Sequence, residues 1–414
     1  MMDLTLDNNR LQKEIAELAL ITEAEPPVVT RVLFSEADLR GRELVKKLCR
    51  EAGLNLRADA AGNIFARWEG VDQKLSAIAT GSHIDAIPNA GKYDGVVGVL
   101  GAIEAIRALK KSGWRPQRSI ELIVFTAEEP TRFGLGCVGS RLLSGVLRPE
   151  KAAAMRDRDG KSLDEWRLGA GYTGSLNSVC LPKNCYSAFV ELHIEQGPIL
   201  ERERKEIGIV EKIAAPSTLR IQLKGVGGHA GTVLMPERHD AGLAGAEIAL
   251  AVEGAATGTG SPDTVGTTGV FRIEPGAVNS VPCRAWLEID VRDTKAATRD
   301  AALAQIETAA AEICQRRGVE LQTDRLNVDP PAICDGALVE TVAEVCQQLG
   351  ISHQKMISRA YHDTLFMAQI CPSTMIFIPC RGGVSHRPDE YASPEHIELG
   401  VKVLAQALAR FAGR

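Results

Sequence analysis

Hydrophobic positions along the chain follow two periods that alternate with each other. Apolar residues recur at helical spacing over residues 11–20, 36–52 and 96–112. Between them lie short apolar runs typical of strands, at residues 63–68, 75–80, 119–126 and 188–193. Because strand, helix and strand follow one another over residues 75–126, this segment predicts a βαβ unit. The first part of the chain is therefore expected to be an α/β domain.

The pattern changes character after about residue 213. Strands are predicted at residues 217–224, 264–274, 285–292 and near 321, with helices at 237–253 and 298–317. This β-α-β-β-α-β order is that of a ferredoxin-like α/β sandwich. The helix, strand and helix expected at residues 337–349, 375–379 and 394–412 then restore the first pattern. We therefore predict a discontinuous domain of residues 1–212 and 329–414, with a mixed sheet and helices on both faces, and an inserted domain of residues 213–328.

Composition narrows the classes of partner. The chain has 414 residues, 45% of them apolar, and a net charge of −5 spread without basic or acidic blocks. These values favour a globular protein with a small-molecule partner over one that binds nucleic acid or anionic lipid. No apolar run reaches the roughly 20 residues of a membrane helix. The ten cysteines form no CxxC pair and the first ten residues do not resemble a signal sequence, so we expect a cytoplasmic protein with reduced thiols.

The first candidate for chemistry is the segment 81–95, which follows the apolar run 75–80. It places His83, Asp85 and Asp94 around a turn at the end of a predicted strand. Open α/β sheets carry their active sites at the carboxyl ends of strands. Taken alone, a His-x-Asp sequence fits a hydrogen-bonded structural pair as well as a metal site.

Three further segments place ligand-type residues beyond predicted strands. They contribute the pair Glu128–Glu129, then His193, and then His386. Imidazole and carboxylate ligands suit Zn²⁺, Mn²⁺ or Co²⁺, and a carboxylate such as Asp94 can bridge two ions about 3.5–4 Å apart that together activate one water. One glutamate of the pair could then bind metal while the other acts as a general base. By itself, an adjacent pair of acids is usually solvated surface charge.

The sequence around these residues resembles the M20 metallopeptidase family, specifically its amidase branch of N-carbamoyl amino acid, allantoate and ureidoglycolate amidohydrolases. The segments that carry the likeness are Glu-Glu-Pro-Thr-Arg-Phe-Gly at 128–134, Gly-Ser-Arg at 139–141 and His-Ile-Glu-Gln-Gly-Pro at 193–198. The resemblance implies two divalent ions per subunit, Zn²⁺, Mn²⁺ or Co²⁺, with Asp94 bridging them. The implied ligands are His83, Asp94, Glu129, His193 and His386. It further implies that Glu128 is the catalytic base and that Asp85 supports His83 from behind.

The same resemblance makes the insert a lid and dimerisation domain that supplies substrate contacts. His229 would stabilise the oxyanion, Asn279 would bind a ureido group and Arg292 would hold a carboxylate. Gln196 and His362 are expected to line the same cavity. In such a homodimer His229 and Asn279 would reach the partner's site. Judged without the resemblance, His229, Asn279 and Arg292 are more often a turn residue, a strand end and a solvated edge position, respectively.

These observations lead to the hypothesis of a metal-dependent amidohydrolase that cleaves the ureido C–N bond of a small carboxylated ureido acid and releases ammonia and CO₂. The nearest alternative is an aminoacylase or peptidase acting on N-acyl amino acids or dipeptides. A binding protein that lost the chemistry is a second alternative, and a dehydrogenase is disfavoured because no GxGxxG follows the first strand. The sequence does not separate ureidoglycolate, allantoate, N-carbamoyl-β-alanine and N-carbamoyl-α-amino acids as substrates.

Overall fold

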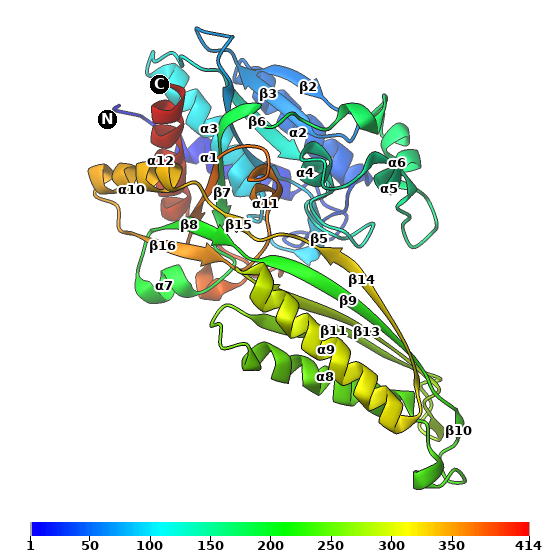
Figure 1. Cartoon of the computed structure of the whole chain (residues 1–414). Coiled ribbons are helices and arrows are strands. Elements are labelled where there is room, and N and C mark those ends of the chain that lie inside the picture. The colour runs from blue at the N-terminus through cyan, green and yellow to red at the C-terminus, as the bar shows by residue number, and fades with distance from the viewer. Residues whose placement is uncertain (1, 414) are drawn as a thin grey trace. The chain divides into compact units, whose positions relative to one another are not determined.

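A computed structural model describes residues 2–413, which form two compact units (Figure 1). The first unit contains the residues up to Glu211, Ile333–Ser358 and the residues from His362 onward, and the second contains Lys212–Ala332 and Arg359–Tyr361. Residues 329–332 and 359–361, which we had expected in the first unit, group with the second. One reason is local, because the Arg359 guanidinium lies 2.9 Å from Asp263 of the second unit. Among the described residues no helix combines the length and the apolar character needed to cross a bilayer.

The first unit is built on a large mixed sheet. Its strands lie side by side in the order β15 (Ala332–Ile333), β8 (Ile207–Ile213), β17 (Ser373–Ile378), β7 (Tyr186–Ile194), β4 (Ala77–His83), β6 (Ile120–Phe125), β3 (Ile64–Trp68) and β2 (Asn55–Ala58), with β16 (His353–Ser358) paired to β8. The central strands β17, β7, β4 and β6 are parallel to one another, whereas β3, β2 and β8 are antiparallel to their neighbours. The parallel strands are therefore buried on both sides, and they are mostly apolar, with the buried Glu121 and Glu191 among their residues.

Helices cover both faces of this sheet. On one face α3 (Val96–Lys111) and α12 (Pro394–Ala412) pack on the central strands, with α1 (Asn8–Ala19) and α10 (Gly336–Leu349) outside them. Helix α3 is apolar nearly all round because it lies between the sheet and α12. A Cβ at Gly98 would lie 2.3 Å from the carbonyl oxygen of Leu192, so glycine is needed for this close approach.

The other face carries shorter elements. They are α4 (Val138–Leu143), α5 (Pro149–Ala154), α6 (Leu163–Gly169) and α11 (Asp363–Met367), which share a core with Phe65, Phe125 and Phe189. Helix α2 (Glu36–Glu51) packs near β2 and β3, α7 (Ile199–Glu203) follows β7, and single turns of 3-10 helix lie at Leu176–Ser178 and Arg381–Gly383, with another at Met235–Glu237 in the second unit. A separate two-stranded sheet pairs β1 (Val29–Arg31) with β5 (Ala86–Ala90). We had expected a bend at residues 88–91, so this strand was missed.

The second unit has the element order and sheet of a ferredoxin-like sandwich. Strands lie in the order β11 (Val265–Glu274), β13 (Arg284–Asp293), β9 (Ala215–Lys224) and β14 (Glu320–Val328), all antiparallel to their neighbours. Helices α8 (Ala241–Gly258) and α9 (Ala296–Arg317) pack on one face of this sheet (Figure 1). Helix α8 begins four residues later than predicted because the Asp240 carboxylate accepts a hydrogen bond from Leu243 N and caps it. A small ribbon of β10 (Gly228–His229) and β12 (Ser280–Val281) completes the unit.

Candidate metal centre

The predicted ligands of the first unit meet at the carboxyl ends of its parallel strands. His83 is the last residue of β4, His193 is the next-to-last residue of β7, and Glu128–Glu129 follow β6 by two residues. His386 lies in the segment between β17 and α12. Strand β4 runs three residues further than predicted, so His83 stands on the strand itself.

Asp94 lies between the other ligands, and each of its carboxylate oxygens faces a different group. Oδ1 is 3.4 Å from His83 Nε2 and 3.2 Å from His193 Nε2. Oδ2 is 3.3 Å from His386 Nε2, which is itself 3.3 Å from Glu129 Oε1. The five residues thus form two groups of three ligand atoms that share Asp94. This is the arrangement that a carboxylate bridging two cations requires.

The histidine tautomers fit this interpretation. His83 Nδ1 donates to the carbonyl oxygen of Asp85 at 3.0 Å, and His193 Nδ1 donates to that of Ile194 at 2.8 Å. With the proton on Nδ1, each neutral imidazole leaves an Nε2 lone pair on the side of Asp94, where that of His193 also accepts from Gly95 N at 3.1 Å. His83 Nε2 is buried and has no hydrogen-bond partner among the described residues. The donor set of imidazoles and carboxylates suits Zn²⁺, Mn²⁺ or Co²⁺, so the residues fit the expected metal ions.

The electrostatics of the site reflect an accumulation of buried acids. Burial alone lowers the pKa of an imidazole, yet the Glu128, Asp94 and Asp85 carboxylates hold the pKa of His83 well above its usual value. Contacts with Asp94 and Glu129 raise the pKa of His386 to about 11. Negative charge therefore dominates the centre, and a cation there would be strongly stabilised.

Glu128 has the position expected of a base. Its Oε2 lies 3.7 Å from His83 Nε2, and its Oε1 accepts a hydrogen bond from the Cys137 thiol at 3.5 Å. Burial, with a contribution from the neighbouring Glu129, raises the pKa of Glu128 well above its usual value. Glu129 turns toward His386 instead, so the two adjacent glutamates face different groups.

The expected role of Asp85 needs a correction. Its carboxylate is 3.7 Å from His83 Nδ1, and the hydrogen bond that orients the imidazole goes to the main-chain carbonyl of Asp85. The carboxylate instead accepts from the main-chain N–H groups of Glu128, at 3.3 Å, and Glu129, at 3.1 Å. Because the chain bends after His83, the two side chains do not share one face of a strand. The Asp85 carboxylate therefore holds the main chain of the candidate base and of one candidate ligand.

Two predicted substrate residues of the first unit also contact the ligands. Gln196 Nε2 donates to Asp94 Oδ2 at 2.6 Å, while Gln196 Oε1 is buried with no hydrogen-bond partner among the described residues. The buried His362 ring packs edge-on against the His193 ring, with centroids 4.5 Å apart. Gln196 thus has an acceptor left for a ligand, whereas His362 lies against a ligand imidazole.

The remaining predicted residues belong to the second unit. His229 is exposed on β10, and the main-chain carbonyl of Asn279 accepts from Ala230 N, so His229 and Asn279 are neighbours on the same ribbon. Arg292 lies near the other end of β13, and its guanidinium holds the Asp290 carboxylate at 2.7 Å and stacks over the Tyr361 ring. The fork expected to hold a substrate carboxylate thus already contacts an acid of its own strand.

Sequence reasoning missed several buried residues around the centre. Glu191 accepts from Ser82 Oγ and from Thr364 Oγ1, and Glu390 accepts from the main chain of Tyr93 and Asp94. The Glu191 signal was available, since residues two apart on a strand share a face and His193 was already a candidate. Glu390 offered no such signal because it lies in a loop rich in charged residues.

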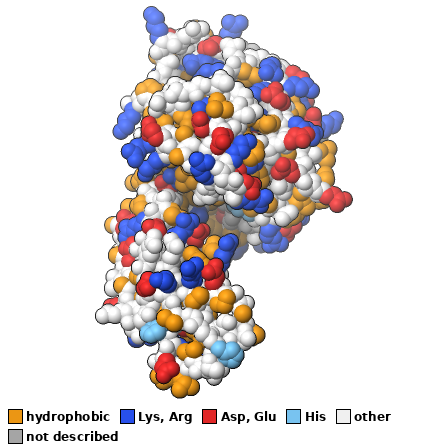
Figure 2. Space-filling model, turned by 90° about the vertical axis from the view of Figure 1, so that its right-hand side faces the viewer, with side chains coloured by type: hydrophobic (Ala, Val, Ile, Leu, Met, Phe, Trp, Pro, Cys, Tyr) orange, Lys and Arg blue, Asp and Glu red, His pale blue; other side chains and the backbone are white. Residues whose placement is uncertain are grey.

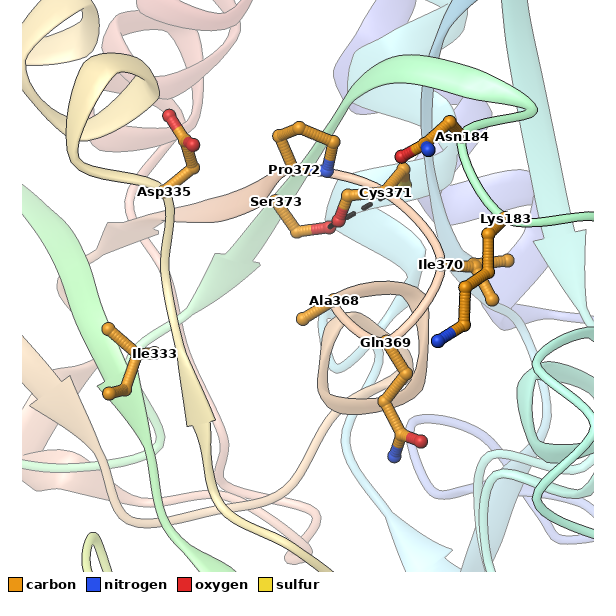
Figure 3. Close-up of a pocket in the computed structure, with 10 residues that line it drawn as sticks. All are labelled: Lys183, Asn184, Ile333, Asp335, Ala368, Gln369, Ile370, Cys371, Pro372 and Ser373. Carbon is orange, nitrogen blue, oxygen red and sulfur yellow. Dashed lines mark hydrogen bonds between the residues drawn. The ribbon is translucent and has the colours of Figure 1, made fainter.

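A different pocket, of about 280 Å³, lies away from this centre (Figure 3). Its lining includes Asn184, two residues before β7, and Ser373, the first residue of β17. These are the amino ends of the two strands, whereas the candidate metal ligands lie at or beyond the carboxyl ends. The pocket is therefore separate from the candidate site.

The fold and the site together define a class: an α/β protein with a carboxylate-bridged cluster of metal-ligand residues at its strand ends. The family model of peptidase family M20/M25/M40 matches residues 79–410. The chain belongs to this family, whose enzymes are metal-dependent.

Similar proteins refine this placement. The ureidoglycolate hydrolase of Arabidopsis thaliana is 52% identical over 414 residues, covering 98% of this chain and 87% of the relative. The N-carbamoyl-L-amino acid amidohydrolase of Geobacillus stearothermophilus is 36% identical over 400 residues, covering 96% and 97%. Among solved structures, that of AtUAH in complex with (S)-hydroxyglycine is 52% identical with a TM-score of 0.92, covering 99% of this chain and 98% of that chain. The likeness to the amidase branch of the family is confirmed.

Proposed function

We propose that this protein is a metal-dependent amidohydrolase that cleaves the ureido C–N bond of a small ureido acid, with ureidoglycolate as the first candidate substrate. The observation that carries the proposal is the Asp94 carboxylate, whose two oxygens face two separate ligand groups. The choice of ureidoglycolate as the first candidate substrate comes from the similar proteins. Hydroxyglycine, present in the similar AtUAH structure, is the amine that remains when ureidoglycolate loses its carbamoyl group.

Two divalent cations would be held by His83, Asp94 and His193 on one side and by Asp94, Glu129 and His386 on the other. When bound, they supply Lewis-acid polarisation of the carbonyl group and lower the pKa of a water. Glu128 accepts the proton of the attacking water, whose oxygen forms a bond to the carbamoyl carbon. The C–N bond then breaks, and Glu128 returns the proton to the leaving amine. The carbamoyl group ends as ammonia and CO₂.

Other residues orient the substrate. The free acceptor Gln196 Oε1 suits an N–H of the ureido group, because it is buried beside Asp94 without a partner among the described residues. Arg292 binds the substrate carboxylate by exchanging Asp290 for it, and His229 and Asn279 contact the carbonyl and ureido groups.

The second unit acts as a lid and dimerisation domain in a homodimer. Asn279 lies beyond Arg284, and Arg292 is eight residues further along β13. At about 3.4 Å per residue this separates Arg292 from the His229–Asn279 ribbon by about 27 Å, more than a small ureido acid spans. One site therefore needs Arg292 from one chain and His229 with Asn279 from its partner. Exposed Val226, Leu234, Met235 and Val278 surround this ribbon, and Figure 2 shows hydrophobic side chains gathered on the surface of this unit.

Ammonia release tests the substrate assignment. Ureidoglycolate, allantoate, N-carbamoyl-β-alanine and an N-carbamoyl-α-amino acid are compared in parallel with Mn²⁺, Zn²⁺ and Co²⁺, beside a dipeptide. A marked preference for ureidoglycolate supports the proposal. Release of free amino acids from the dipeptide, without ammonia release from the ureido acids, would show a peptidase instead.

Subunit mixing tests the shared site. Glu128→Gln and His229→Ala chains are each expected to be inactive, but a mixed dimer contains one site with both residues intact. Because half of randomly paired dimers are mixed, up to about a quarter of the wild-type activity should return. If differently tagged chains co-purify as mixed dimers without any activity, His229 does not act across subunits.

A further inference from the structure

The carboxylate of Glu390 lies directly behind the bridging Asp94. It is buried, and its Oε1 accepts from Tyr93 N at 2.8 Å and from Asp94 N at 3.2 Å. The two segments are 296 residues apart in the chain, so this contact exists only in the folded protein. Glu390 therefore fixes the main chain from which the bridging carboxylate projects.

The second oxygen of Glu390 extends the connection to the other side of the centre. Ser385, which precedes His386, has its Oγ at 2.8 Å from Glu390 Oε2 and at 2.8 Å from Asp94 Oδ2. One carboxylate thus joins the main chain at Asp94, the side chain of Asp94 and the loop that carries His386. A hydrogen bond from Arg381 N to Tyr391 O at 2.8 Å closes this loop at its base.

The Glu390 side chain is closely packed on the side of Gly91. A Cβ at Gly91 would come within 2.4 Å of Glu390 Cβ and 2.5 Å of its Oε1. Gly91 therefore lets the segment before Asp94 wrap closely around the Glu390 side chain. The Glu390 carboxylate is thus held by main-chain hydrogen bonds, by a side-chain hydrogen bond and by close packing.

We propose that Glu390 is a positioning residue that sets Asp94 and His386 in the geometry needed to hold two metal ions. This inference rests on the proposed function, because it requires that the centre binds metal ions. Metal ligands must lie within a few tenths of an ångström of ideal distances, and residues that orient ligands contribute about 10–100-fold to metal affinity. Glu390 contributes hydrogen bonds and does not itself contact the reacting atoms.

The test measures Mn²⁺ affinity by titration calorimetry. The full chain is first freed of metal with a chelator, and Mn²⁺ is then titrated into it. Glu390→Ala should weaken Mn²⁺ binding by at least about tenfold, in keeping with the cost of losing such support. Glu390→Gln should stay within about threefold of wild type, because the amide oxygen accepts from the main chain and the amide nitrogen donates to Ser385. Asp389→Asn is the matched control, since Asp389 is an exposed acid of the same loop paired with Arg387.

The metal-free unfolding midpoint separates positioning from a purely structural role. Positioning predicts midpoints close to wild type for both Glu390 variants and a difference only in Mn²⁺ affinity. Unchanged affinity in Glu390→Ala overturns the inference, and so does equal weakening in Glu390→Gln. Should Glu390→Ala fail to fold, Ser385→Ala carries the test with an expected three- to tenfold loss, and no loss overturns it. A wild-type chain that takes up no Mn²⁺ would instead overturn the proposed metal centre.

Discussion

The replacement Glu128→Gln is the sharpest test of the chemistry, because it changes one proton acceptor and almost no volume. Glu128 is buried, with Oε2 3.7 Å from His83 Nε2 and Oε1 beside the Cys137 thiol. An amide keeps the contact with the thiol but cannot take a proton from water. General bases contribute about 10²–10⁴-fold, so kcat should fall by that factor, or about 2.7–5.5 kcal/mol in activation free energy.

The assay combines ammonia release from ureidoglycolate with the metal content per chain. Because Glu128 is not among the five proposed ligands, the metal content should equal that of wild type. Glu195→Gln is a matched control: Glu195 accepts from Ile199 N and Leu200 N and contacts none of the ligands. Its activity should stay within about threefold, as expected away from the reacting atoms. Activity of Glu128→Gln within tenfold of wild type, with full metal content, would refute the assignment of the base.

Two further substitutions test the substrate and metal contacts. Arg292→Ala should raise KM for carboxylated substrates by about 10–150-fold and leave kcat less affected, because a hydrogen bond to a charged group contributes about 1.5–3 kcal/mol. The control is Arg220→Ala on the same sheet. An unchanged KM in Arg292→Ala, or an equal rise in the control, would exclude Arg292 from the site. Gly95→Ala should lower the bound metal, because its Cβ would lie 2.5 Å from His83 Nε2. Gly113→Ala shares the positive φ but has nothing within 4 Å, so equal metal loss in both variants would show backbone strain rather than displacement of His83.

The sequence predicted the residues of the centre that lie on strands better than those that lie in loops. His83 lies three residues beyond the apolar run 75–80 and His193 ends the mostly apolar run 188–193, and such runs mark buried parallel strands whose carboxyl ends meet. Their convergence followed from the topology alone. The course of the chain between His83 and Asp94 was not predictable in the same way. Pro88 and Asn89 are typical of turns, yet they lie in β5, which pairs with a strand nearly 60 residues earlier.

Acidic residues were the hardest to interpret. A charged side chain in a loop is usually solvated, and nothing local distinguishes Glu390 from its exposed neighbour Asp389. What buries Glu390 is the approach of Tyr93 and Asp94, a tertiary contact without a local signal. Asp85 shows a related limit. The spacing identified the residue, but the bend after His83 decided which atoms its carboxylate contacts.

The charge of the centre favours bound cations. Since both His83 and His193 donate their Nδ1–H groups to main-chain carbonyls, their rings are neutral when Nε2 acts as a ligand. The buried carboxylates of Asp85, Asp94, Glu128 and Glu129, with those of Glu191 and Glu390 close behind, then give the centre a net negative charge when they are ionised. Uncompensated charge at this depth is costly, so divalent ions held by the proposed ligands would offset it. Asp94 directs one oxygen toward each ligand group, which supports the proposal of two ions.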